Sequence, residues 1–131
     1  MNVKIIVPKY PLNHILKYIQ SGNVVFRFRN LRPNLLGESI PLHDHETKHE
    51  ADIVNLSVHI RVEELPAVII HECLHLILPE PHAEQLVLQL ERRILRTMTQ
   101  KQINKLLHIV LAHSCWIWEA RVKRNVGSQY D

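Results

Sequence analysis

The sequence predicts a small α+β fold in which a sheet of about three strands packs on one helix, with two further helices following it. Two observations predict this class: short segments with alternating apolar residues occupy the first half of the chain, and helical periodicity dominates the second half. The chain has 131 residues and is 46% hydrophobic, which suffices for one core. We therefore expect residues 1–131 to form a single domain.

The first half of the chain is expected to place one helix between strands. Residues 3–7 form a short apolar run typical of a strand, and Pro11 then opens a helix whose apolar residues keep helical spacing until a Ser-Gly pair ends it. Residues 24–29 alternate phenylalanine with arginine, as in a half-buried strand. We expect residues 30–50 to be loop, because they contain proline, glycine and a long polar run.

The second half begins with the most regular strand pattern and continues with helices. Residues 53–62 alternate between two sets of side chains, which predicts a strand. Pro66 suits the first turn of a helix, and from residue 67 to residue 78 all but three residues are apolar. A Pro-Glu-Pro break precedes a helix over about 82–98, and a last helix covers about 101–123.

Composition and charge exclude several classes of protein. The apolar run near the N-terminus is too short for a signal peptide, and the longest apolar stretch falls short of the ~20 residues that a membrane span needs. Two cysteines, Cys73 and Cys115, are too few for a disulfide framework. We expect a cytoplasmic protein with no membrane partner.

The basic residues do not predict a nucleic-acid-binding protein. The net charge is only +3, and a basic stretch over the last two helices has no accompanying aromatic platform. It is expected to be a solvated face, so nucleic acid is not an expected partner. The apolar residues 116–118 suit either the core or a face that forms a homodimer. The basic stretch consists of Arg92, Arg93, Arg96, Lys101 and Lys105.

The three polar residues of the apolar helix belong to one motif. His71-Glu72-Cys73-Leu74-His75 is an HExxH sequence, which is typical of zinc hydrolases. Residues at positions i and i+4 share a helix face, so both imidazoles can reach one metal ion. The carboxylate of Glu72 lies beside them, in the position of a general base for the metal's water.

The surroundings of the motif favour the metal interpretation over a chance match on an exposed helix face. Buried imidazole and carboxylate groups without partners would cost several kcal/mol, and a zinc ion would satisfy them together. The strand ahead of the helix is also expected to offer an edge to an extended peptide.

Three residues compete to be the third zinc ligand that a catalytic site requires: His82, Glu84 and Glu91. Both glutamates fall within the widened apolar arc of the helix over 82–98, whereas His82 lies at its edge. A short hairpin places Glu84 about one turn into the returning helix, near His75. Glu84 is therefore favoured, His82 and Glu91 remain alternatives, and Glu91 suits the role of orienting a ligand histidine.

An HExxH motif followed by a glutamate on the next helix resembles the gluzincin class of zinc metallopeptidases. Residues 66–95 carry the resemblance, which is greatest to the minigluzincins and to short HExxH proteins of phage and mobile elements. It implies a single minimal zincin-like domain with His71, His75 and Glu84 as zinc ligands. It also implies that Glu72 is the catalytic base and acid.

The sequence therefore predicts zinc-dependent hydrolysis of a protein or peptide substrate by a metal-activated water, with Glu72 as general base. Both an active and a latent form of such an enzyme are compatible with the sequence. The alternative is a binding or structural module that zinc stabilises without turnover. Both hypotheses predict bound zinc, and they differ in whether Glu72 is needed for an activity. The oxyanion-stabilising donor is left open among Tyr10, His108, His113 and Tyr130.

Overall fold

The computed structural model describes residues 10–42, 51–78 and 83–113. Within these ranges the chain is an α+β fold with a three-stranded mixed sheet and four helices, which confirms the predicted class. The predicted strand over residues 3–7 lies outside the described residues. The elements are α1 (Pro11–Gln20), β1 (Val24–Arg29), β2 (Gly37–Ile40), β3 (Asp52–Ser57), α2 (Leu65–Ile77), α3 (Ala83–Thr97) and a helix that is described over residues 100–113.

The sheet has the strand order β1-β3-β2, so β3 is the central strand. β1 runs parallel to β3, with Val24 opposite Asp52, and β2 runs antiparallel to β3, with Gly37 opposite Leu56. Residues 53–57 of β3 are buried throughout. Both sets of alternating side chains are thus covered, and the two outer edges of the described sheet belong to β1 and β2.

Strand β2 corrects the prediction that residues 30–50 form a loop. Its four residues, Gly37–Ile40, carry no alternating apolar pattern, because one member is glycine and the middle two are polar. Pairing with β3 makes this segment a strand, in keeping with the dependence of strand formation on neighbours more than on intrinsic preference.

The predicted strand over 53–62 is also wrong at its C-terminal end, because β3 ends at Ser57. The partners end at the same level: Arg29 of β1 pairs with Ser57, and Gly37 of β2 pairs with Leu56. Val58 and Val62, which continue the alternation, are 48% and 73% exposed. The apolar pattern therefore extends beyond the point at which the described sheet can bury it.

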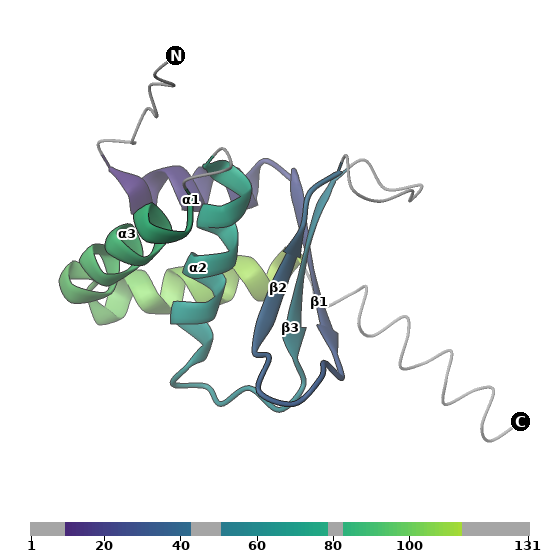
Figure 1. The fold of residues 1–131 in the computed structure, drawn as a ribbon. Helices are drawn as coiled ribbons and strands as arrows, with labels where there is room; N and C mark the ends of the chain where they lie inside the picture. Colours follow the sequence, from purple (N-terminus) through teal and green to yellow (C-terminus); the bar gives the residue numbers. More distant parts are fainter. Residues whose placement is uncertain (1–9, 43–50, 79–82, 114–131) are drawn as a thin grey trace, which may run out of the picture.

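The helices pack on one face of the sheet, and α2 lies between the sheet and α3 (Figure 1). Ile69, Ile70, Cys73 and Leu74 on one side of α2 are buried in the core that includes Val54 and Leu56 of β3. Burial of these apolar side chains is the main term that fixes α2 against the sheet. Further core residues come from α3 and the 100–113 helix: Val87, Leu90, Ile94, Leu106 and Val110.

The opposite face of the sheet carries a row of polar side chains. Arg27 of β1 donates from Nε to Oδ1 of Asn55 at 3.0 Å, and Nδ2 of Asn55 donates to Oε1 of Glu38 at 2.8 Å. Because Asn55 is buried, these bonds satisfy an amide that would otherwise be costly to bury. Residues 38 and 55 therefore point away from α2, whereas their strand neighbours point toward it.

No helix within the described ranges is long and apolar enough to cross a membrane.

Truncating Ile69, which is 0% exposed on the sheet-facing side of α2, should destabilise the fold strongly. We expect Ile69→Ala to lower the free energy of unfolding by about 2–5 kcal/mol, because it removes buried apolar contacts and leaves a cavity. Urea denaturation measures the change. Val62→Ala, at a 73% exposed position, is the control and should change it by less than about 0.5 kcal/mol. Equal effects of the two substitutions would contradict the placement of α2.

Candidate metal centre

Helix α2 separates the residues of its HExxH motif into two faces. Cys73 and Leu74 face the core and are buried, whereas His71, Glu72 and His75 are only partly buried. Cys73 is a free cysteine, and burial raises the pKa of its thiol, so it packs as an apolar group. The burial of the other face of α2 therefore holds the three polar side chains together on the outer face.

The two motif histidines point their Nε2 atoms at one another. These atoms lie 3.2 Å apart, and the ring planes are inclined by 66°. The spacing of one helical turn between His71 and His75 brings the rings into this relation. Both side chains are about four-fifths buried, at 24% and 19% exposure.

Glu84, in the first turn of α3, brings its carboxylate to the same point. Its Oε2 lies 2.9 Å from Nε2 of His75, and its Oε1 lies 3.8 Å from Nε2 of His71. The side chain is 62% exposed, so the cluster opens to solvent on this side. The structure thus brings together the ligand set that the sequence favours: His71, His75 and Glu84.

Glu91 contacts the other side of His71. Its Oε2 lies 2.8 Å from Nδ1 of His71, and its side chain is 18% exposed. A carboxylate accepts a hydrogen bond there, so Nδ1–H of His71 donates to Glu91 and the lone pair of Nε2 faces the cluster. Glu91 thus lies level with His71, where it can orient the imidazole ring. His82 lies outside the described residues.

The donor groups lie near the separations that a tetrahedral zinc ion requires. Zinc–ligand bonds of about 2.0–2.1 Å in a tetrahedron place the donor atoms about 3.3 Å apart. The two Nε2 atoms are 3.2 Å apart, and the two oxygens of Glu84 lie 2.9 Å from His75 and 3.8 Å from His71, respectively. One ligand atom from each of the three residues lies within 4.8 Å of the others. Two of the groups that meet here are hydrogen-bond acceptors, because the Nε2 lone pair of His71 and the carboxylate of Glu84 face each other. A cation satisfies such a group, and imidazole with carboxylate is a ligand set that zinc accepts.

Glu72 is a partly buried carboxylate beside the cluster. Burial raises its pKa, while His71, His75 and a hydrogen bond from Ser39 act in the opposite direction. A nearby glutamate, Glu84, adds a smaller raising effect. The carboxylate of Glu72 therefore interacts with both histidines, but it does not belong to the group of residues that could hold a metal ion.

A cleft of about 580 Å³ opens along the outer face of α2 beside the cluster. It reaches from the residues before α2 to the motif, and one wall is the start of β2. Its lining includes apolar side chains, four glutamates and His71. The lining residues are Asn34, Leu36, Gly37, Glu63, Glu64, Ala67, Val68, His71, Glu72 and Glu91.

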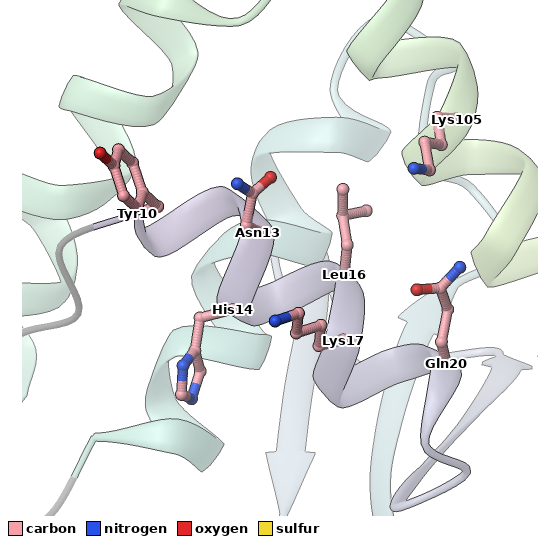
Figure 2. A pocket seen from close by; sticks show the side chains of 7 residues that line it. All are labelled: Tyr10, Asn13, His14, Leu16, Lys17, Gln20 and Lys105. Atoms are coloured by element: carbon pink, nitrogen blue, oxygen red, sulfur yellow. The ribbon is translucent and has the colours of Figure 1, made fainter.

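A second pocket, of about 440 Å³, lies between α1 and the 100–113 helix and contains none of the motif residues. Figure 2 shows its polar side chains spread along α1, with no meeting point comparable to the histidine cluster. Three of the oxyanion candidates, Tyr10, His108 and His113, are absent from the lining of the cleft beside α2, and Tyr130 lies outside the described residues.

Ser39 and Gly37 reach the site from β2, and neither residue is predicted from the sequence to lie there. Neither residue carries a motif, and their segment has no strand pattern. Their only signal in the sequence is a glycine and a serine within an expected loop, which is too common to single out. The pairing of β2 with β3 brings them to α2.

Comparison of the chain with known protein families, with curated proteins and with solved structures finds no significant match.

The two glutamates of α3 should differ in their effect on zinc affinity. We expect Glu91→Ala to weaken zinc binding about 10- to 100-fold, because His71 loses the partner that orients it. Glu84→Ala should weaken binding more, because it removes a ligand. Competition with a chromophoric chelator measures both affinities. Glu38→Ala removes the same charge on the far face of the sheet and should leave zinc affinity unchanged. A larger loss of zinc affinity from Glu91→Ala than from Glu84→Ala would contradict this assignment and would make Glu91 the ligand.

Proposed function

We propose that the protein is a zinc-dependent peptidase in which His71, His75 and Glu84 bind the metal and Glu72 is the general base. The observation that carries this proposal is the convergence of donor groups from two helices on one point, with one ligand atom of each of the three residues within 4.8 Å of the others. Three ligands from the described part of the chain would leave a coordination position for water or substrate, as catalytic zinc sites do. Glu72 lies beside this point without joining the ligand set.

When bound, zinc lowers the pKa of a water molecule and polarises a carbonyl group as a Lewis acid. The chain's own residues supply the proton transfers. Glu72 is expected to accept a proton from the attacking water and to return it to the leaving amine. Glu91 keeps the Nδ1 proton of His71 in place, so that Nε2 stays directed at the cluster.

The cleft along α2 offers a place for a protein or peptide substrate. Its wall includes His71 and Glu72, and its volume of about 580 Å³ is sufficient for several side chains of an extended peptide. The sequence predicts that the strand ahead of α2, which is β3, offers an edge to the peptide, but β3 is the central strand of the sheet. The edge that supports this proposal is therefore that of β2. A peptide laid along α2 would pass the histidine cluster.

The alternative function is a binding or structural module in which zinc joins α2 to α3 without turnover. The distribution of the donor atoms over both helices supports this function as well. It gives no role to Glu72, whose carboxylate is partly buried at some energetic cost beside a cluster that does not need it as a ligand. The peptidase hypothesis accounts for this carboxylate, and for that reason we favour it.

We further infer that the protein works in the cytoplasm. Cys73 is a free thiol in the core, which is consistent with a reducing compartment. The five basic residues between positions 92 and 105 are exposed, as expected of a solvated face, and we propose no nucleic-acid partner. Residues 116–118, on which the homodimer hypothesis rests, lie outside the described part of the chain.

Replacing Glu72 with glutamine separates the two functions. We expect Glu72→Gln to reduce zinc-dependent peptide hydrolysis at least about 100-fold, because the amide cannot take up the proton. Zinc content and the urea midpoint of unfolding should stay at the wild-type values. Cleavage of a quenched fluorescent peptide library measures the activity. Hydrolysis that survives this substitution would exclude Glu72 as the base, and a zinc-loaded wild-type protein with no hydrolysis would favour the structural module.

The charge of the cleft predicts the charge of the preferred substrate. Apart from His71, the charged residues that line it are glutamates, and Glu63 is exposed at the end away from the histidines. We expect peptides with lysine near the scissile bond to have a KM about two- to fivefold lower than matched peptides with glutamate, since exposed ion pairs are worth at most about 1 kcal/mol. Peptide pairs compared at low and high salt test this, and Glu63→Lys should weaken the preference. An equal KM for both peptides would contradict it.

A further inference from the structure

Strand β2 directs one of its two faces at α2. Gly37 and Ser39 lie opposite Leu56 and Val54 of β3, and those two residues point into the core that α2 completes. Side chains of paired residues in neighbouring strands lie on the same face of a sheet. Positions 37 and 39 therefore face α2, whereas Glu38 between them faces the polar row on the far side of the sheet.

Gly37 allows β2 to approach α2 closely. A Cβ atom at this position would lie 2.6 Å from Cγ1 of Val68 and 3.3 Å from Cγ of Glu72. The φ angle of Gly37 is not positive, so any residue type can adopt its backbone conformation. Glycine is required here for space, and the space that it leaves is filled by the side chains of Val68 and Glu72.

Ser39 acts on the same glutamate from the same face of β2. It lies opposite Val54 and so faces α2, and a hydrogen bond from its side chain acts to lower the pKa of the Glu72 carboxyl group. A glutamate has several rotatable bonds, and a hydrogen bond to its charged end removes part of that freedom before a substrate arrives. The carboxylate retains further acceptor positions that remain available to water in the cleft.

The residue types at the two positions are unfavourable for a strand. Glycine weakens a strand, and serine lacks the β-branched or aromatic side chain that packs well on a sheet. At position 39 stability alone would favour an apolar β-branched residue such as valine, whereas position 37 has no room for one. Lack of space beside Val68 explains the glycine, and a role at Glu72 explains the hydroxyl group at position 39.

We propose that β2 holds the general base: Ser39 and Gly37 are positioning residues that fix the carboxylate of Glu72 beside the histidine cluster. This inference rests on the proposed peptidase function, because it assigns a purpose to a rigid Glu72. Ser39 fixes the direction of the carboxylate through its hydrogen bond. Gly37 sets the distance between β2 and α2. Neither residue contacts the donor atoms of the cluster, so both act through Glu72.

Three variants test the role of Ser39. We expect Ser39→Ala to lower kcat about 10- to 100-fold, because small displacements of a catalytic group have effects of this size. KM and zinc content should stay within about twofold of the wild-type values. Ser39→Thr keeps the hydroxyl group and should restore most of the lost kcat. Glu38→Ala breaks a hydrogen bond on the other face of the same strand and should leave kcat unchanged.

The results separate failure of this inference from failure of the proposed function. If the wild-type protein shows no zinc-dependent hydrolysis, the proposed function fails. If the wild-type protein is active and Ser39→Ala has the same kcat as Glu38→Ala, the peptidase stands and the role of Ser39 is refuted. Loss of kcat in Ser39→Ala together with loss of zinc would likewise refute it, because the residue would then support the metal ligands.

A measurement without turnover tests the contact itself. Urea midpoints of Ser39→Ala, Glu72→Ala and the double variant in metal-free protein form a double-mutant cycle. We expect Ser39→Ala to lower the midpoint less in the Glu72→Ala background than in the wild-type background. Equal shifts in both backgrounds would show that the two side chains do not interact, and would overturn the proposal.

Gly37 needs its own test, because added volume can simply unfold the strand. We expect Gly37→Ala to lower both the urea midpoint and kcat, since its Cβ meets Val68 and Glu72. Adding Val68→Ala removes the 2.6 Å contact and should recover the midpoint, while the 3.3 Å contact with Glu72 remains and keeps kcat reduced. Full recovery of kcat in the double variant would leave Gly37 with a packing role only.

Discussion

The rest of the structure depends on α2, which packs in the core with one side and carries the polar motif residues on the other. Successive residues of a helix point in different directions, so Cys73 and Leu74 are buried in the core while His71 and His75 lie on the other side. The two imidazole nitrogens lie 3.2 Å apart at the edge of the core, close enough to hydrogen-bond to each other or to share one bound cation. Glu84 and Glu91 contact these histidines from α3.

The two glutamates of α3 serve one histidine from opposite sides. They are separated by seven residues, or about two helical turns, so both lie on the face of α3 that meets α2. Glu84 reaches the side of His71 that carries Nε2, and Glu91 reaches Nδ1. One imidazole is thereby fixed in direction and in the position of its proton. Under the proposed function, this arrangement directs the lone pair of Nε2 at the metal ion.

Much of this arrangement could be predicted from the sequence because it depends on local helical spacing. The pairing of His71 with His75 follows from the geometry of one helix, and the position of Glu84 follows from a short hairpin between two helices. The contribution of β2 could not be predicted, because Gly37 and Ser39 become neighbours of Glu72 only through pairing with a distant strand. The alternation beyond Ser57 was equally misleading, since it continues where the described sheet has no further partner. Local periodicity thus predicts which side chains lie on one face of a helix or strand. The pairing of distant strands decides which residues contact that face.

The proposed function requires His71 and His75 to share one divalent cation with a carboxylate from α3. The most direct test is X-ray absorption at the zinc edge, combined with a crystal structure of the zinc-loaded protein. The account predicts one ion bound by Nε2 of both histidines and by an oxygen of Glu84, at bond lengths of about 2.0–2.2 Å. Histidines that remain solvated and free of metal in ample zinc, with Glu72 turned away from them, would contradict it.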